Sequence, residues 1–232
     1  MARGQRLMET AGVESGLDPV YVCSRCGTQD SAETAIWHCS NCEGLLEGWP
    51  AVTFSARDVD DQETGLWRYA RALPPLPASE RVRLGEVMTP LVESEPLAAM
   101  LKVDYLFPSG SYKDRGGAVL VSRLRHLGVR QALEDSSGNA GASIAAYSAA
   151  AGISCEVFVP AGNSPDKLAQ IEAYGRHCGR STVTALRSRG RRSRPRKRAS
   201  TPATIGTPTF TRAYRVWVSR SGSSAAGARP TR

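Results

Sequence analysis

A single lysine at the start of an expected helix is one of two features of this sequence that could carry out chemistry. Lys113 follows the segment Pro108–Tyr112, which contains a glycine, and precedes the run Asp114–Gly117. At the amino-terminal end of a helix, the backbone amides and the helix dipole create a positive field. That field disfavours the ammonium form and helps the amine to form a Schiff base. Such a lysine on its own is usually an ordinary solvated side chain, so the second feature matters.

The second feature is a short polar loop at another junction between a strand and a helix. It reads Ser-Ser-Gly-Asn-Ala and consists of Ser136, Ser137, Gly138, Asn139 and Ala140. Free backbone N–H groups at a helix N-terminus bind anions such as a carboxylate, and the serine hydroxyls add donors. The glycine allows a ligand to approach the backbone closely. Alone, this loop would indicate only a capped helix start.

Four of the six cysteines form a separate cluster near the amino terminus. Two Cys-x-x-Cys pairs supply them: Cys23, Cys26, Cys39 and Cys42. Paired spacing of this kind is typical of a zinc site, and four thiolates leave no open position, so the zinc would be structural. Gly27 and Gly44 follow the two pairs and suit tight turns, and His38 is interpreted as a bystander. The alternatives are a redox pair or two disulfides.

The elements that must position these residues alternate between helical and strand patterns. Apolar spacing, β-branched runs and helix-ending residues predict three helices and two strands. The expected helices cover residues 113–127, 140–151 and 165–175, and the expected strands cover residues 131–134 and 154–159. Alternation of this kind predicts an α/β fold with a parallel sheet.

In this order and about 25 residues apart, the two reactive segments resemble the tryptophan-synthase-β family of pyridoxal-phosphate (PLP) enzymes, which have fold type II. The resemblance runs from Thr89-Pro90-Leu91-Val92 to Gly175. The Lys-Asp-Arg-Gly run that begins at Lys113 is more similar to threonine synthases than to dehydratases. Threonine-synthase relatives also carry an amino-terminal zinc ribbon. Tyr112 departs from the pattern, since phenylalanine is common at this position.

The resemblance implies a role for each residue of the two segments. It implies that Lys113 holds PLP as a Schiff base and that Asn139 hydrogen-bonds the 3′-oxygen of the cofactor. The groups that it implies for the substrate carboxylate are Ser136, Ser137 and the amides of Gly138 and Ala140. The implied reaction is loss of phosphate from O-phosphohomoserine and addition of water at the β-carbon, which gives threonine. Lys113 would move protons as general base and acid.

Other functions stay open at this point. A threonine or serine dehydratase and a cysteate-synthase-like β-replacement enzyme fit the same motifs. A zinc-ribbon protein with a basic nucleic-acid-binding arm is the alternative of another class. The net charge of +8 favours that last class only at first sight, because all 22 acidic residues and half of the 30 basic residues lie in residues 1–175. We therefore expect an amino-acid substrate, with no nucleic-acid or membrane partner.

Residues 176–232 differ from the rest, because they hold the other half of the basic residues and no acidic residue. They are interpreted as a disordered basic tail without homology to the family, a nucleic-acid arm, or the product of a reading-frame change after Gly175, and the last is favoured. The glycine-rich loop for the PLP phosphate and the residue facing the pyridine nitrogen belong to the carboxyl-terminal half of the family, and neither is recognisable. We therefore expect this chain to be a truncated, inactive form.

The expected organisation has five parts: a disordered amino terminus (1–19), a zinc ribbon (20–50), a connector (51–85), the amino-terminal half of a fold-type-II PLP domain (86–175) and the tail (176–232). The sequence contains no apolar run of membrane-spanning length, and its first residues lack the apolar stretch of a secretory signal. A cytoplasmic protein is the expectation, and full-length relatives are expected to be homodimers.

Overall fold

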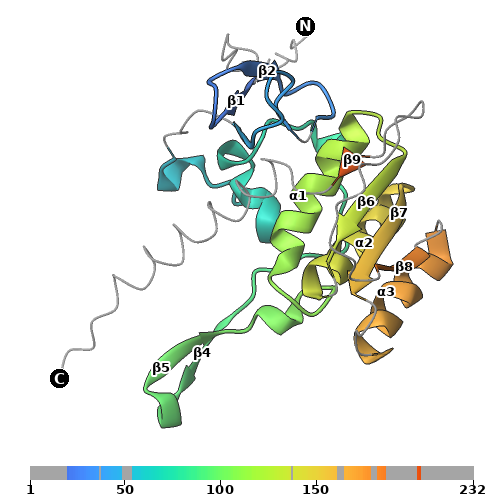
Figure 1. Cartoon of the computed structure of the whole chain (residues 1–232). Helices are drawn as coiled ribbons and strands as arrows, with labels where there is room; N and C mark the ends of the chain where they lie inside the picture. The colour runs from blue at the N-terminus through green and yellow to red at the C-terminus, as the bar shows by residue number, and fades with distance from the viewer. Residues whose placement is uncertain are drawn as a thin grey trace, which may run out of the picture.

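The computed structural model describes residues 20–36, 38–48, 54–136, 138–160, 165–178, 182–186 and 203–204. Their strands form a three-stranded sheet, a two-stranded sheet and a four-stranded sheet (Figure 1). Among these residues, no helix combines the length and apolar character that crossing a membrane requires.

The three-stranded sheet builds a small amino-terminal ribbon. β1 (Val20–Cys23) lies between β2 (Gln29–Ser31) and β3 (Leu46–Gly48) and is antiparallel to both. Side chains of β1 alternate, so that Tyr21 and Cys23 are buried, as a strand with one covered face requires. The ribbon thus carries a cysteine at the end of its central strand.

Three 3-10 turns then lead the chain toward the body: η1 (Ala56–Asp58), η2 (Gly65–Ala72) and η3 (Ala78–Glu80). Trp67 of η2 is 2% exposed and belongs to the main core. The Val82 amide donates to Ser122 Oγ at 2.8 Å, which fixes the end of the connector on the helix that follows. The connector is therefore part of the packed body.

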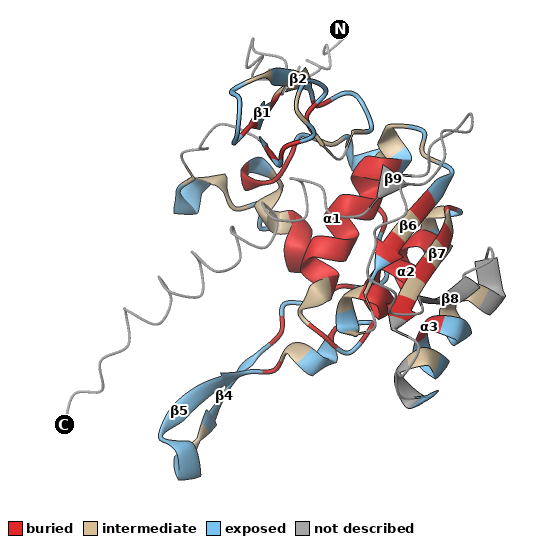
Figure 2. Ribbon diagram, viewed as in Figure 1, coloured by how far each residue is buried: buried red, intermediate tan, exposed pale blue. Residues whose placement is uncertain are grey.

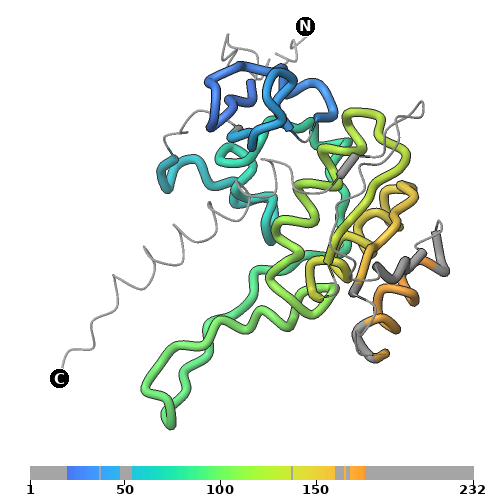
Figure 3. Tube along the Cα trace, in the orientation of Figure 1, coloured from blue at the N-terminus to red at the C-terminus, as the bar shows by residue number. Residues whose placement is uncertain are grey.

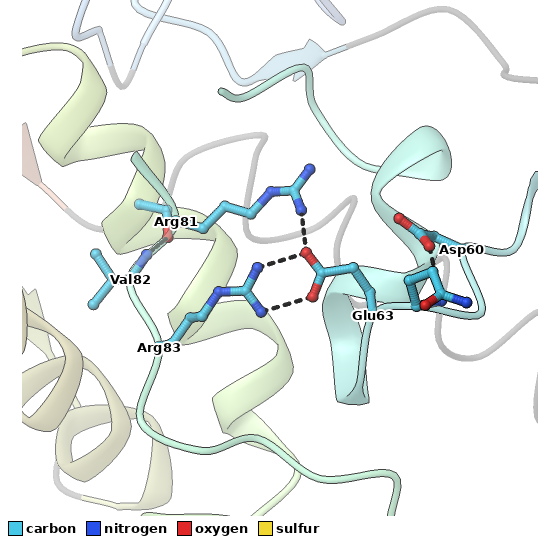
Figure 4. Close-up of polar contacts among 7 residues, drawn as sticks. Asp60, Glu63, Arg81, Val82 and Arg83 are labelled. Atoms are coloured by element: carbon cyan, nitrogen blue, oxygen red, sulfur yellow. Dashed lines mark hydrogen bonds and ion pairs between the residues drawn. The ribbon is translucent and has the colours of Figure 1, made fainter. Parts of the chain in front are cut away.

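A carboxylate clamp holds the two ends of this connector together (Figure 4). Arg83 donates to both oxygens of Glu63, at 2.7 and 2.9 Å, and Arg81 donates to Glu63 Oε1 at 2.9 Å. The Arg81 guanidinium also lies 5.3 Å from the centroid of the Trp67 ring. Hydrogen bonds from both arginines hold the pKa of the Glu63 carboxyl below its ordinary value.

The two-stranded sheet forms a hairpin that projects from the body, which we call the arm. β4 (Leu91–Ser94) and β5 (Ala99–Lys102) pair antiparallel, and η4 (Glu95–Leu97) joins them. The trace leaves the body and returns to it along neighbouring paths (Figure 3). Nearly all of the arm is exposed (Figure 2), so its own packing cannot fix its direction. A further 3-10 turn, η5 (Asp104–Leu106), returns the chain to the body.

The four-stranded sheet and three helices form the body and confirm the predicted α/β architecture. The elements follow in the order α1 (Lys113–His126), β6 (Gln131–Asp135), α2 (Asn139–Ala151), β7 (Ser154–Pro160), α3 (Pro165–Cys178), β8 (Thr182–Leu186) and β9 (Ala203–Thr204). All neighbouring strands are parallel, in the order β8-β7-β6-β9. The predicted helices and strands therefore lie where the patterns place them, with small shifts at their ends.

Local chemistry explains these boundaries. The apolar stripe of α1 is buried, and the alanine-rich α2 is buried over most of its length. Gly152 ends α2 with φ of 68°, the left-handed conformation that favours glycine at this position. In β7, Cys155, Val157 and Val159 alternate into the core.

The prediction that ordered structure ends at Gly175 is wrong for a few residues. Helix α3 continues to Cys178, and both β8 and β9 fall within residues 176–232. The run Thr182–Leu186 begins with three β-branched residues, which suit a strand, and it pairs along β7 on the side away from β6. The other residues of this range lie outside the described part of the chain.

Helices α1 and α2 approach each other closely at one glycine. A methyl group placed on Gly117 would lie 2.4 Å from Ser143 Oγ and 3.6 Å from Ser143 Cβ. The first distance is much shorter than a normal contact, whereas the second is ordinary. Glycine at this position therefore lets the two helices lie against each other.

We expect Gly117→Ala to lower the free energy of unfolding by about 1–3 kcal/mol, because overpacking forces neighbouring atoms apart. The double variant Gly117→Ala/Ser143→Ala should regain that loss, since only the hydroxyl is too close. Ser143→Ala alone should be nearly neutral, because Ser143 Oγ has no hydrogen-bond partner among the described residues. Urea unfolding of the four proteins measures these effects, and equal destabilisation of the single glycine variant and the double variant would contradict the assignment.

Candidate functional site

The loop before α1 holds Lys113 at the first position of the helix. Gly110 adopts φ of 80°, and its amide donates to the Phe107 carbonyl at 2.7 Å, so the chain turns sharply. The Lys113 amide then donates to Ser111 Oγ at 3.1 Å. This bond satisfies one of the amides that have no partner within the first turn of a helix.

A buried carboxylate secures the same loop from within the helix. Asp114 is fully buried, and its Oδ2 accepts the Ser109 amide at 2.7 Å, while its Oδ1 accepts the Ser109 hydroxyl. From the other side, Gln170 of α3 donates to the Ser109 carbonyl at 3.0 Å. The loop preceding Lys113 is thus fixed by α1 itself and by α3.

The Lys113 side chain is half-buried, and its ammonium group lies 4.9 Å from the centroid of the Tyr112 ring. A cation at this distance from an aromatic face is held by the quadrupole of the ring. The residue where the sequence departs from the family pattern therefore still supplies an aromatic ring beside the amine.

The polar loop after β6 forms the start of α2. Gly138 is the N-cap, and its amide lies 3.4 Å from Ser136 Oγ. Beside Gly138 an added methyl group would meet no atom within 4 Å among the described residues, chain neighbours aside. Ser136 and Ala140 are half-buried and Asn139 is exposed, whereas Ser137 lies outside the described residues.

Sequence reasoning missed a second glycine in this loop. A methyl group on Gly141 would lie 2.3 Å from the Ser136 carbonyl oxygen. The first turn of α2 can therefore fold back over Ser136 only because residue 141 lacks a side chain. The glycine two residues after Asn139 was visible in the sequence, but its use depends on a contact that no local pattern shows.

The two predicted segments meet at one end of the body. Gly117 and Ser143, which touch, each lie four residues into their helices, after Lys113 and Asn139. The helices run in the same direction, and their amino-terminal ends lie toward the carboxyl end of β6 (Figure 1). The structure thus brings Lys113 and the Ser136–Ala140 loop to the carboxyl edge of the parallel sheet, where open α/β sheets bind ligands.

Glu134 is a site residue that sequence reasoning did not select. It lies on β6 two residues before Ser136 and is only 6% exposed. Burial and, to a smaller extent, the charge of Asp135 raise the pKa of Glu134 to about 7, although the charge of Lys113 offsets part of the rise. A carboxyl group that titrates near neutrality thus lies within electrostatic reach of the lysine.

The four cysteines of the ribbon converge as their spacing predicts. Their sulfur atoms all lie within 4.8 Å of one another, with Cys23 and Cys42 at 3.5 Å and Cys26 and Cys39 at 3.6 Å. Four sulfurs around one zinc at about 2.3 Å would be about 3.8 Å apart in a tetrahedron. The set could therefore hold one metal ion.

The two knuckles turn in the same way but use different residues. The Gly27 amide donates to Cys23 O at 3.0 Å with φ of 72°, and the Glu43 amide donates to Cys39 O at 3.1 Å with φ of 55°. The expectation that Gly44 provides the second turn is therefore wrong. Gly44 is required for a different reason, because a methyl group there would lie 2.9 Å from Cys23 Sγ.

Comparison with known proteins adds independent information. The family profile described as pyridoxal-phosphate dependent enzyme matches residues 82–214, and so continues past Gly175. Threonine synthase of Methanocaldococcus jannaschii is 36% identical over 170 residues, covering 66% of this chain and 41% of that protein. Threonine synthase of Methanosarcina acetivorans is 33% identical over 164 residues, covering 66% and 40%.

Among solved structures, O-ureido-L-serine synthase is 27% identical, with a TM-score of 0.37 over 42% of this chain and 33% of that one. The chain spans about two fifths of the length of the threonine synthases that it matches.

Glu134 should make the stability of the protein depend on pH. Its pKa rises from an ordinary 4.5 to about 7 on folding, so its contribution is fully favourable below about pH 4.5 and is lost as pH rises through about 7. At about 1.4 kcal/mol for each pKa unit, the loss is on the order of 3 kcal/mol. Glu134→Gln should therefore be more stable than the parent at pH 8 and nearly equal to it at pH 4.5.

Urea unfolding at both pH values measures this difference. Glu156→Gln, at a half-buried position of the neighbouring strand, is the matched control for the chemical change itself. If Glu134→Gln gains no stability relative to the parent between the two pH values, Glu134 is not titrating inside the folded protein.

Proposed function

Because the chain belongs to the family of pyridoxal-phosphate-dependent enzymes, we propose that it carries the cofactor-holding lysine of a threonine-synthase-like lyase. The observation that carries the proposal is the placement of Lys113 and the Ser136–Ala140 loop at the ends of two parallel helices in contact. The named relatives favour threonine synthase over a dehydratase or a β-replacement enzyme. The chain spans about two fifths of the length of those relatives. We therefore propose the activity for a whole protein of which such a chain would form a part.

The residues at this end of the sheet fit PLP and an amino-acid substrate. Lys113 would supply a half-buried amine for the cofactor aldehyde, and a methyl group at Gly138 would meet no described residue within 4 Å, chain neighbours aside. Asn139 would hydrogen-bond the 3′-oxygen of PLP. The substrate carboxylate would be held by Ser136, Ser137 and the amides of Gly138 and Ala140, where the free N–H groups of a helix start favour an anion.

When bound, PLP supplies an electron sink for the negative charge that develops on the substrate. The protein supplies orientation and proton transfer. Lys113 Nζ would accept a proton from the substrate and later return one, acting as general base and then general acid. The overall reaction proposed is O-phosphohomoserine plus water to threonine plus phosphate, in which the bond from the γ-carbon to the phosphate oxygen breaks and a water oxygen joins the β-carbon.

We further propose that the ribbon binds zinc and that the zinc is structural. Four cysteine ligands would fill a tetrahedral site and leave no position for substrate. The ribbon lies at the far end of α1 from Lys113, because Arg123 in the last turn of that helix donates to the Ala32 carbonyl at 2.8 Å and to Glu33 at 2.6 Å. A cytoplasmic location forms part of the proposal, since a reducing compartment keeps such thiols available.

The test of the lysine is chemical trapping. The chain holds four lysines, so reduction with borohydride in the presence of PLP and mapping of the labelled peptides identifies the reactive amine. We expect Lys113 to be labelled well above Lys102, and Lys113→Ala to lose this preferred label. Lys197→Ala, the matched control, should keep it. Equal labelling of all four lysines would contradict the proposal, and phosphate release from O-phosphohomoserine is expected only from a protein with the carboxyl-terminal half of the family.

The test of the ribbon is the metal content of the purified protein. We expect one zinc for each chain, and Cys26→Ser should reduce both the zinc content and the stability of the ribbon, because structural zinc contributes folding free energy directly. Cys155→Ser is the matched control, since Cys155 is a buried thiol of the parallel sheet outside the cluster. Loss of zinc in both variants, or its absence from the parent, would contradict a four-cysteine site.

A further inference from the structure

An ionic cluster around the buried Arg115 ties the base of the arm to the first turn of α1. Arg115 lies two residues after Lys113 and is only 8% exposed. It donates from Nη1 to Asp104 Oδ2 at 3.1 Å and from Nη2 to Asp104 Oδ1 at 2.9 Å. Paired contacts of this kind fix the orientation of a guanidinium as well as its position.

Both strands of the arm converge on this arginine. Thr89 precedes β4, and its hydroxyl accepts from Arg115 Nη2 at 3.2 Å and donates to Asp104 Oδ1 at 3.1 Å. Lys102, the last residue of β5, donates from Nζ to the Thr89 carbonyl. The cluster therefore closes the base of the arm and attaches it to α1 at the same point.

The ring of Phe107 also contacts the guanidinium of Arg115. The Phe107 ring centroid lies 4.3 Å from Arg115 Cζ, within the range of a cation–π contact. Burial lowers the pKa of Lys102, and the charge of Arg115 lowers it further. Among the charged groups of the cluster only the guanidinium of Arg115 is buried, since Asp104 is half-buried and Lys102 is exposed. Partly exposed ion pairs add little stability, so the value of the cluster to the protein lies in the geometry that it imposes.

Successive residues of a helix point about 100° apart, so Lys113, Asp114 and Arg115 leave the first turn of α1 in three different directions. Asp114 is fastened to the Ser109 loop, and Arg115 is fastened to the arm. With two of the three directions fixed, the turn cannot rotate about the helix axis. The direction in which the Cα–Cβ bond of Lys113 leaves the helix is then determined, and with it the region that its amine can reach.

We propose that Arg115 is a positioning residue, whose pairing with Asp104 fixes the direction in which Lys113 presents its amine toward the Ser136–Ala140 loop. The inference rests on the proposed function of Lys113 as the cofactor-holding lysine. Arg115 itself touches no reacting atom. It acts through the helix turn, and it makes the arm a part of the frame that aims the lysine.

The experiment compares two amine reagents on the full chain. Labelling by PLP with borohydride is enhanced where an amine is aimed at a site that holds the cofactor, whereas labelling by acetic anhydride requires only an accessible, unprotonated amine. In Arg115→Lys, a single ammonium replaces the paired donors, and lysine is not equivalent to arginine at such a site. We expect the ratio of PLP labelling to acetylation at Lys113 to fall on the order of tenfold to a hundredfold, the usual effect of a small misplacement.

Arg83→Lys is the matched control, because Arg83 makes a similar paired contact with Glu63 in the connector (Figure 4). Its ratio at Lys113 should equal that of the parent. Asp104→Asn is the second variant: it keeps the guanidinium on Phe107 and removes only the carboxylate charge, and it serves if Arg115→Lys does not fold. A fall in the ratio in either variant with an unchanged urea midpoint supports the positioning role.

An unchanged ratio in both variants, or in Asp104→Asn alone where Arg115→Lys does not fold, would overturn the inference and leave the proposed function intact. A parent protein in which PLP shows no preference for Lys113 over Lys102 would contradict the proposed function, and the positioning role would fall with it. The proposed function is therefore tested on the parent protein, whereas the positioning role is tested on the variants.

Discussion

The contact between α1 and α2 at Gly117 is the constraint on which the rest of the body depends. Because Ser143 lies against a residue without a side chain, the two helices can contact each other near their amino-terminal ends. A larger residue would separate or tilt them. The consequence reaches both ends of the helices, because a lysine and a polar loop far apart in the sequence are brought to one edge of the sheet by the same contact.

Polar burial is concentrated at that edge, while the apolar core lies behind it. Asp114 and Arg115 are both buried in the first turn of α1, whereas the following turns bury Val119, Leu120 and Val121. Burying charged groups costs free energy, and here each of the two has a specific partner in a neighbouring segment. The apolar residues of the later turns thus stabilise the helix, whereas Asp114 and Arg115 orient its first turn.

Much of the fold and the chemistry could be predicted from local patterns, because helix and strand periods and the spacing of cysteines are properties of short segments. The start of α1 at Lys113 and the ending of α2 before Gly152 are of this kind. The roles of Gly141, Glu134 and Glu43 were not predictable, since each depends on what the fold brings beside it. The origin of residues 176–232 in a reading-frame change stays a prediction.

The bond from Arg123 to the Ala32 carbonyl has a consequence for the order in which the protein assembles. It joins residues 91 positions apart, whereas the contact between Cys23 and Cys42 spans only 19. Closing a long loop costs more chain entropy than closing a short one, and contacts of high sequence separation form slowly. During synthesis the ribbon emerges first and can complete its own short-range contacts. Its docking on α1 must wait until that helix has left the ribosome, so the short-range contacts of the ribbon can form before its contact with the body.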